Sequence, residues 1–158
     1  MLSRIQNGRH SRTPDFGAIL SVDVNRLDFR SALVIEDASV IRSSIVHFLK
    51  KRGWIAHGIR IAGQAIPLLK CIPYHLIVID GNASSVPAIN FVRTLHKSEE
   101  WKKIPLVMIT DSPNVLVEAE LLAAGVRSAR RSDWMADLTN ILAELETHGR
   151  WNRQSYAN

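Results

Sequence analysis

Four short apolar runs, each closed by an oxygen-bearing side chain, constrain the fold of this chain more than any other feature. Ala-Leu-Val-Ile leads into Glu36 and Asp37, Leu-Ile-Val-Ile leads into Asp80, Leu-Val-Met-Ile leads into Thr110, and a weaker run covers 126–132. Runs this short and this rich in valine and isoleucine are typical of strands that are buried on both faces of a parallel sheet. The sequence therefore predicts a parallel sheet.

The segments between these runs carry apolar residues at helical spacing, which predicts strands that alternate with helices. We expect strands over 32–36, 54–59, 76–80, 106–110 and within 126–131. We expect helices over about 39–52 and 64–71, from Val86-Pro87 to about 95, from Ser112-Pro113 to Gly125, and after Asp133. Five such units with short links predict an α/β, doubly wound sheet with helices on both faces, because the crossovers are right-handed.

A chain of 158 residues suits one domain of ordinary size. We expect that domain over 30–147. Residues 1–29 are polar, basic and weakly periodic, so we expect a mostly mobile N-terminal extension, with a short strand over 17–24 as an option. Residues 148–158 are expected to form a C-terminal tail.

Charge and cysteine content limit the cellular setting. The net charge of +5 comes from basic residues that are scattered along the sequence. We expect most of them to lie on solvent-exposed faces. No apolar stretch approaches the roughly 18 to 20 residues that cross a bilayer, and no apolar block follows the basic N-terminus. The single cysteine, Cys71, fits a reducing compartment, and its apolar neighbours predict a buried, inert thiol. We therefore expect a cytoplasmic protein with no membrane partner.

The strand-end oxygens predict a site. In an open parallel sheet, ligands bind beyond the carboxyl ends of the strands, so Glu36, Asp37, Asp80 and Thr110 should converge there. Three carboxylates and a hydroxyl are typical of a site for a hard cation and a phosphoryl group. The alternative is that these side chains are only polar strand ends that reach water and helix amides.

Four blocks of the sequence, 32–54, 76–82, 104–110 and Ala124-Gly125, resemble the receiver domain of two-component response regulators. The resemblance runs from about residue 31 to 147. It implies a flavodoxin-like (CheY-like) fold with a five-stranded parallel sheet in the order 2-1-3-4-5.

The same resemblance assigns roles to the strand-end residues. Asp80 matches the phosphoacceptor, and Glu36, Asp37 and Asp80 match the carboxylates that hold Mg²⁺ together with the backbone carbonyl of Asn82. Thr110 matches the switch hydroxyl. A carboxylate nucleophile can take a phosphoryl group from phosphohistidine, and magnesium offsets the repulsion between the two anions.

The sequence departs from the family pattern at the end of the fifth strand, where family members usually carry a lysine. Counting without a gap from Gly125 puts Ser132 at that position and Trp134 where an aromatic residue often follows. A one-residue deletion would instead bring Arg131 there, but we prefer the ungapped alignment because of Trp134. Arginine is a planar fork and does not replace a point charge.

Two further departures concern the response to phosphorylation. Ala129 takes the place of the usual switch aromatic, so half of the switch pair is missing. Asp111 adds a fourth carboxylate after Thr110, which would either repel an incoming phosphoryl group or cap the next helix. We therefore expect the acceptor half of the site to be intact and the readout half to be altered.

The resemblance predicts a non-enzymatic, stand-alone receiver of a phosphorelay, phosphorylated at Asp80 by a histidine kinase or phosphotransfer protein and acting by protein contact. The alternative is a pseudo-receiver that binds partners whatever its phosphorylation state. A third interpretation is a small phosphatase of the same strand order, which would need a general acid after Asp80. The residue two positions after Asp80 is Asn82, which is not an acid.

The expected partners follow from the same resemblance. The resemblance also offers homodimerisation through the face of the fourth helix, fifth strand and fifth helix. Arg127, Arg130 and Arg131 would either dock an acidic partner there or be solvated. No DNA-reading module follows residue 147, so we do not expect a nucleic-acid partner.

Overall fold

The computed structural model of the chain describes residues 29–82, 88–111 and 115–147. Several sequence predictions lie outside these ranges: the N-terminal extension with its optional strand over 17–24, the helix start at Val86-Pro87, the helix start at Ser112-Pro113, and the C-terminal tail.

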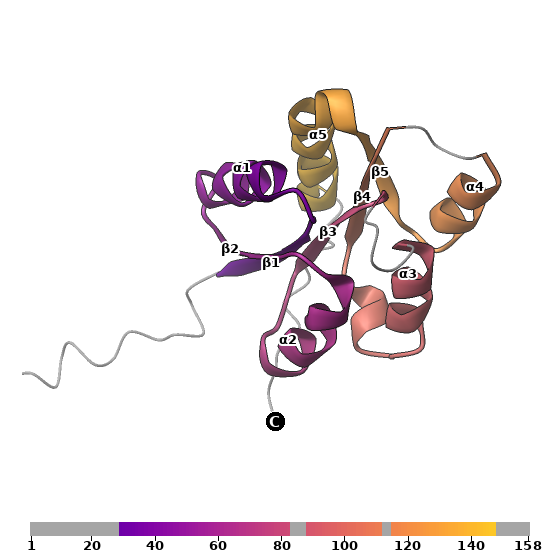
Figure 1. Ribbon diagram of the computed structural model, residues 1–158. Coiled ribbons are helices and arrows are strands. Elements are labelled where there is room, and N and C mark those ends of the chain that lie inside the picture. The colour runs from indigo at the N-terminus through magenta and orange to yellow at the C-terminus, as the bar shows by residue number, and fades with distance from the viewer. Residues whose placement is uncertain (1–28, 83–87, 112–114, 148–158) are drawn as a thin grey trace, which may run out of the picture.

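Five parallel strands form one sheet in the order β2-β1-β3-β4-β5, which confirms the expected order (Figure 1). The strands are β1 (Arg30–Ile35), β2 (Trp54–Ile59), β3 (Leu76–Asp80), β4 (Leu106–Thr110) and β5 (Arg127–Arg130). Three of them, β2, β3 and β4, have the predicted bounds. The expected α/β, doubly wound architecture is therefore correct.

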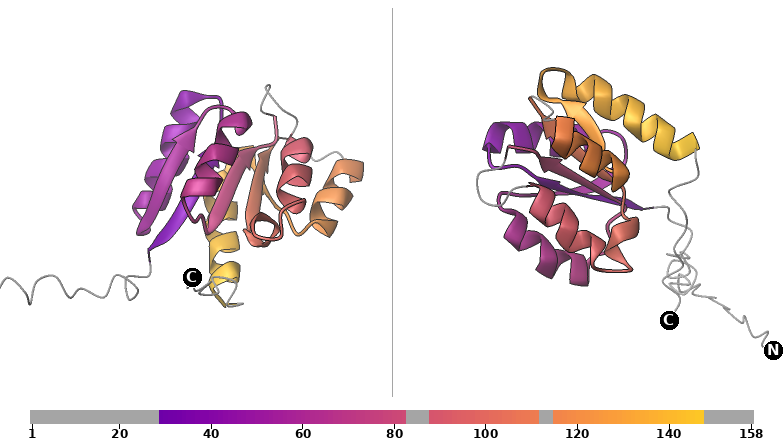
Figure 2. Two further views of the ribbon diagram at one scale, coloured as in Figure 1. Left: turned by 90° about the horizontal axis from the view of Figure 1, so that it is seen from below. Right: turned by 90° about the vertical axis from the view of Figure 1, so that its right-hand side faces the viewer.

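Helices cover both faces of the sheet (Figure 2). On one face lie α1 (Ser39–Lys50) and α5 (Trp134–Thr147), whose buried residues join one apolar cluster. Buried residues of α2 (Ala65–Cys71), α3 (Ala88–His96) and α4 (Val115–Ala123) join a second cluster on the other face. Three short 3₁₀ helices, η3 (Ala62–Gln64), η4 (Trp101–Lys103) and η5 (Arg131–Asp133), were not predicted.

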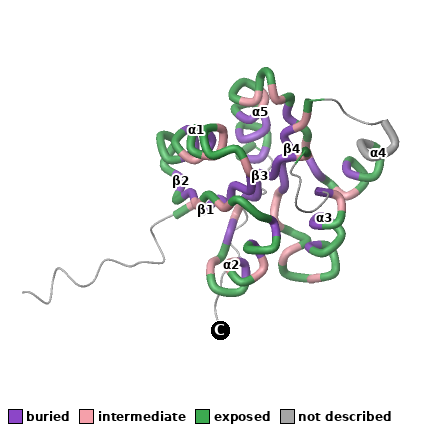
Figure 3. The backbone as a smooth tube through the Cα atoms, viewed as in Figure 1, coloured by how far each residue is buried: buried purple, intermediate pink, exposed green. Residues whose placement is uncertain are grey.

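The central strands are buried on both faces because helices cover both sides of the sheet, and successive side chains of a strand point to opposite sides. In β1, Ala32 and Val34 join the cluster beneath α1 and α5, whereas Leu33 and Ile35 join the cluster beneath α2 and α3. All four are 0% exposed. Figure 3 shows buried residues along the central strands, whereas many helix residues around them are exposed. This explains why the strands read as continuous apolar runs.

Glycines end two of the helical segments. Gly53, after α1, has φ 81°, and Gly125, after α4, has φ 75°. This left-handed conformation favours glycine, since a Cβ would be strained there.

The prediction that Cys71 is buried is wrong, because Cys71 is exposed. It is the last residue of α2, two positions after the buried Leu69, and residues two apart do not share a helix face. Its apolar sequence neighbours therefore do not bury it. Within the described ranges, none of the helices is long and apolar enough to cross a membrane.

Candidate functional site

Three carboxylates meet at the carboxyl ends of the two central strands. Glu36 and Asp37 directly follow β1, and Asp80 is the last residue of β3. The two strands pair in parallel with Ile35 opposite Ile79, so the next residues, Glu36 and Asp80, lie side by side at the carboxyl end of the sheet. One carboxylate oxygen from each of Glu36, Asp37 and Asp80 lies within 4.8 Å of the others. The convergence expected from the sequence is therefore present.

Two of these carboxylates are almost fully removed from water, since Glu36 is 1% and Asp80 is 4% exposed. Burial raises the pKa of Glu36, and the hydrogen bond from the Ala38 backbone N–H to its Oε1 (3.0 Å) opposes that rise. Asp80 Oδ1 accepts a hydrogen bond from the Asn82 backbone N–H (3.0 Å). Backbone amides after each strand thus fix the orientation of both acids.

A positive side chain lies among these acids, and it belongs to Arg131. Its Nη2 donates to Asp80 Oδ1, its Nη1 lies 3.5 Å from Glu36 Oε2, and its Nε lies 3.2 Å from Asp111 Oδ2. The Arg131 side chain is 20% exposed. One guanidinium therefore bridges three carboxylates, a geometry for which its planar fork of donors is suited.

The structure does not place Ser132 in this cluster, in contrast to our ungapped alignment. Ser132 is exposed in η5, and its Oγ donates to Asp133 Oδ2 at 3.0 Å. The physical reason is that β5 ends at Arg130, so Arg131 is the first residue past the sheet and turns toward the site. The deletion that we judged less favourable describes the geometry better.

The same one-residue shift moves the place of the switch aromatic from Ala129 to Ser128. Either residue is small, so the expectation that this aromatic is missing does not depend on the alignment. A hollow of about 400 Å³ lies here, and it is lined by Thr110, Ser128, Ala129, Arg130, Asp137, Asn140 and Ile141. Thr110, the last residue of β4, thus borders a space that no aromatic residue among the described ones fills.

Asp111 is part of the cluster. Besides the ion pair with Arg131, its Oδ2 accepts a hydrogen bond from Asn82 Nδ2 at 2.9 Å. The Asp111 side chain is 59% exposed, so it forms the outer edge of the network. The sequence predicted that Asp111 either repels a phosphoryl group or caps the next helix. Its ion pair with Arg131 was not predicted.

Gly81, between Asp80 and Asn82, allows the strand end to lie close to β4. Its N–H donates to the Ile109 carbonyl oxygen (2.7 Å), and a Cβ added to Gly81 would lie 3.1 Å from that same oxygen. A side chain here would be tighter than an ordinary contact, so the strand end or its neighbour would have to shift slightly. Glycine therefore has a packing role next to the acid cluster.

Arg42 is a site residue that the sequence reasoning missed. Its Nη1 donates to the backbone carbonyls of Glu36 (2.7 Å) and Asp37 (3.2 Å), which holds the segment between β1 and α1. Gly58 in β2 makes room for it, since a Cβ there would lie 3.0 Å from Arg42 Cγ. The available signal was an arginine in the first turn of the helix that follows the acid pair.

The arginines in and directly after the last strand have carboxylate partners within the chain. Arg127 pairs with Glu144 (3.3 Å), Arg130 pairs with Asp137 (3.1 Å), and Arg131 turns into the acid cluster. The Arg130 guanidinium lowers the pKa of Asp137. Their positive charges are thus largely compensated, which weakens the hypothesis that they dock an acidic partner.

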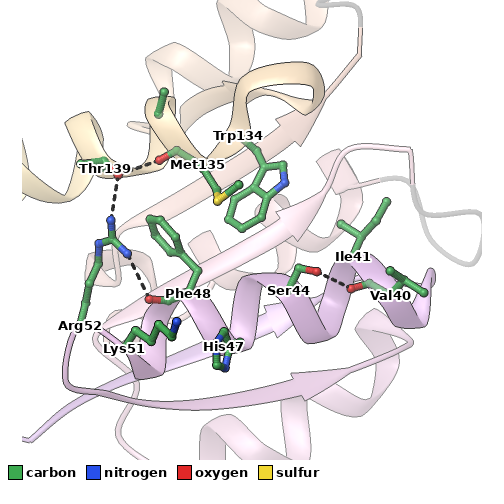
Figure 4. A pocket seen from close by; sticks show the side chains of 11 residues that line it. Val40, Ile41, Ser44, His47, Phe48, Lys51, Arg52, Trp134, Met135 and Thr139 are labelled. Atoms are coloured by element: carbon green, nitrogen blue, oxygen red, sulfur yellow. Dashed lines mark hydrogen bonds between the residues drawn. The ribbon is translucent and has the colours of Figure 1, made fainter.

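An apolar groove runs between α1 and α5 (Figure 4). It encloses about 700 Å³ and is lined by Val40, Ile41, Ser44, His47, Phe48, Lys51, Arg52, Trp134, Met135, Ala136 and Thr139. Phe48 and Trp134 meet edge to face at its floor with ring centroids 5.3 Å apart, and Arg52 lies over the Phe48 ring. Val40 is 77% and Met135 57% exposed. The groove begins where both helices begin, close in sequence to the acid pair and to Arg131.

The donor set fits a small, hard divalent cation. The three converging groups are all carboxylates, and such cations prefer oxygen ligands and need only one or two carboxylates from the protein. Arg131 contacts oxygens of the same Glu36 and Asp80 side chains. Either kind of positive charge would therefore offset the repulsion between the acids.

No protein-family model and no curated protein matches the sequence. The structure, however, is similar to solved receiver domains. The chemotaxis response regulator CheY4 of Vibrio cholerae gives a TM-score of 0.67 at 19% identity, covering 74% of this chain and 98% of CheY4. The receiver domain of a signal transduction histidine kinase from Syntrophus aciditrophicus gives 0.69 at 16% identity, covering 82% and 96%.

A response regulator receiver protein from Pseudomonas putida gives a TM-score of 0.67 at 20% identity, with 73% of this chain and 97% of that chain covered. Identities this low show the fold alone. The chain has the CheY-like fold of receiver domains, as the sequence resemblance implied.

Proposed function

We propose that this protein is a response regulator receiver that accepts a phosphoryl group at Asp80. The observation that carries the proposal is the position of Asp80: a buried carboxylate at the end of a central strand, within 4.8 Å of oxygens of Glu36 and Asp37. Both hydrogen bonds that the described residues donate to Asp80 go to Oδ1. Oδ2 is therefore the oxygen best placed to attack phosphorus.

In the proposed step an Asp80 oxygen forms a bond to the phosphorus of a phosphohistidine. The phosphorus–nitrogen bond breaks, and its electron pair stays on the imidazole. Glu36, Asp37, Asp80 and the backbone carbonyl of Asn82 would hold Mg²⁺, which would offset negative charge on the phosphoryl group. Thr110, at the end of the next strand, would supply the switch hydroxyl.

The phosphoryl donor would be a histidine kinase or a phosphotransfer protein. The α1–α5 groove offers a surface for it, because the groove starts beside the acid cluster and exposes the apolar side chains of Val40 and Met135. Its charged or titratable lining residues are His47, Lys51 and Arg52. A helix with apolar and acidic residues would be complementary to it.

The second candidate is a pseudo-receiver that binds partners without phosphorylation, and the Arg131 ion pairs favour it. A guanidinium that already neutralises Asp80 and Glu36 reduces the need for a metal and occupies an oxygen of the acceptor. Dimerisation through α4, β5 and α5, and a cytoplasmic location, remain predictions from the sequence resemblance.

One experiment separates the two candidates. Wild type and Asp80→Asn are incubated with acetyl phosphate and magnesium and run on a phosphate-affinity gel. A retarded band in wild type that is absent from Asp80→Asn supports the receiver. No retarded band in wild type, together with no binding of beryllofluoride, contradicts it and favours the pseudo-receiver.

A further inference from the structure

Arg131 forms ion pairs with two of the carboxylates that would hold magnesium. Its Nη2 contacts Asp80 and its Nη1 contacts Glu36, and these two acids are 4% and 1% exposed. A guanidinium is a positively charged group with a planar fork of N–H donors. Two positive charges on the same pair of buried oxygens repel each other strongly, because screening by water is weak there. Arg131 and a divalent cation therefore compete for the cluster.

The guanidinium is already paired with a third carboxylate, that of Asp111. Arg131 Nε lies 3.2 Å from Asp111 Oδ2, and Asp111 is much more exposed than the two inner acids. Asn82 Nδ2 donates to the same Oδ2 and so orients Asp111. If Nη1 and Nη2 leave Glu36 and Asp80, the contact to Asp111 can persist.

We propose that Arg131 is a resident counter-ion of the acid cluster, which a divalent cation must displace toward Asp111 before Asp80 can react. Asp111 is then a positioning residue that holds the displaced guanidinium. This inference deepens the proposed function and rests on its metal site. It explains why a fourth carboxylate stands after Thr110: Asp111 offsets the charge of Arg131.

The fork of the arginine side chain is essential to this role. One planar group with donors on three nitrogens contacts Asp80, Glu36 and Asp111 together. A lysine ammonium is a point charge and does not bridge carboxylates in this way. Arg131→Lys therefore keeps the charge but loses the bridge.

The test is magnesium affinity, measured by calorimetry at constant ionic strength on the full chain. We expect Arg131→Gln to bind Mg²⁺ at least about tenfold more tightly than wild type, because the competing charge is gone. Arg131→Lys should lie between the two. The matched control is Arg130→Gln, which removes the neighbouring arginine that pairs with Asp137, and its affinity should stay within about twofold of wild type.

Asp111→Asn distinguishes the positioning role from simple loss of negative charge. In the wild-type background we expect it to weaken Mg²⁺ binding. In the Arg131→Gln background the same change should have a much smaller effect, because no guanidinium is left to hold. Equal effects in both backgrounds would show that Asp111 acts only through its own charge, which rejects the positioning role.

Thermal unfolding with EDTA or MgCl₂ gives a readout that does not depend on phosphorylation. We expect Arg131→Gln to unfold at a lower temperature than wild type in EDTA and to gain more from magnesium. Unchanged or weaker Mg²⁺ affinity in folded Arg131→Gln overturns the inference while the proposed function stands. Binding by the variant alone supports the inference and rejects magnesium-dependent phosphorylation of wild type; binding by neither rejects both.

Discussion

His75 shows how a single polar residue is fixed by its surroundings at the start of a central strand. It immediately precedes β3 and is half-buried, and burial lowers its pKa. Its Nδ1 accepts a hydrogen bond from the Ser31 backbone N–H (3.2 Å) and lies 2.9 Å from Ser31 Oγ. A proton on Nδ1 would face the Ser31 N–H, so the fold requires the neutral ring.

Protonation of His75 should therefore destabilise the protein. Because its folded pKa lies below the unfolded value, the unfolded state takes up the proton first. The stability contributed by the neutral ring is fully present above about pH 6.5 and is lost as the pH falls toward the folded pKa. We expect the urea midpoint of wild type to fall between about pH 8 and 5 more steeply than that of His75→Asn, whose amide oxygen can accept the same hydrogen bond.

His96→Gln is the control for this prediction, because His96 is exposed on α3. Its pH profile should follow that of wild type. If His75→Asn instead showed the same slope as wild type, the loss of stability at acidic pH would have to come from other groups.

The acids of the candidate site could be predicted from the sequence. The sequence did not show that Arg131 is the positively charged residue among them. Glu36 and Asp80 end continuous apolar runs, and parallel pairing fixes their neighbourhood once the strands are known. Arg131 follows Arg-Ser-Ala-Arg, a strand of four residues with only Ala129 buried. Such a weak pattern does not fix where the strand ends, and one residue decides which side chain enters the site.

At the scale of elements, α1 and α5 are two helices that bury one stripe each and leave a groove between their outer edges. Ile45, Phe48 and Leu49 of α1 face the sheet, while Val40 lies at the groove with 77% of its surface exposed. The apolar spacing that predicted α1 included Val40, but Val40 is not among the buried residues of that helix. Val40 and Met135 instead line the groove with most of their surface exposed, and apolar spacing alone does not separate such residues from the core.

We expect the groove to matter for phosphorylation by a protein donor and not by a small molecule. The double variant Val40→Asp/Met135→Asp places two negative charges on the apolar rim and should slow transfer from the kinase that phosphorylates wild type by about tenfold or more. Phosphorylation by acetyl phosphate, which needs no docking surface, should stay within about twofold of wild type. Rates are followed on phosphate-affinity gels.

Leu122→Asp is the matched control, since Leu122 is an apolar residue of α4 that is 67% exposed and does not line the groove. Its transfer rate from the kinase should equal that of wild type. A uniform loss in all variants would indicate general damage, and an unaffected double variant would place the kinase on another surface.

For the whole molecule, stability depends on two apolar layers with the sheet between them. Leu138 of α5 is 0% exposed within the layer beneath α1 and α5. Leu138→Ala leaves a cavity, and we expect a loss of about 2 to 5 kcal/mol in the free energy of unfolding, measured by urea titration. Leu122→Ala, on the exposed side of α4, should change it by no more than about 0.5 kcal/mol.

The fold as a whole was predictable because its main signals are local and repeated. The central strands β1, β3 and β4 contain apolar runs, and Gly53 and Gly125 mark helix ends. The strand order, by contrast, came from the resemblance to receiver domains, since alternation of strands and helices does not distinguish it from other parallel orders. The short 3₁₀ helices have no periodic signal, and they were missed.

The same two layers define the unit that should fold by itself. All residues of both apolar clusters lie between Ala32 and Leu145, and an ion pair between Arg30 and Glu146 joins the first strand to the end of the last helix. We expect a chain of residues 29–147 to unfold cooperatively, with a free energy of unfolding within about 1 kcal/mol of that of the full chain.

A chain of residues 29–137 is the informative contrast. It lacks Leu138, Ile141, Leu142 and Leu145, the residues that α5 buries against the sheet. We expect it to show no cooperative thermal transition by circular dichroism, because one face of the sheet would be left in water. A large loss of stability in the 29–147 chain would instead mean that residues outside this range belong to the folding unit, contrary to the predicted boundaries at 30 and 147.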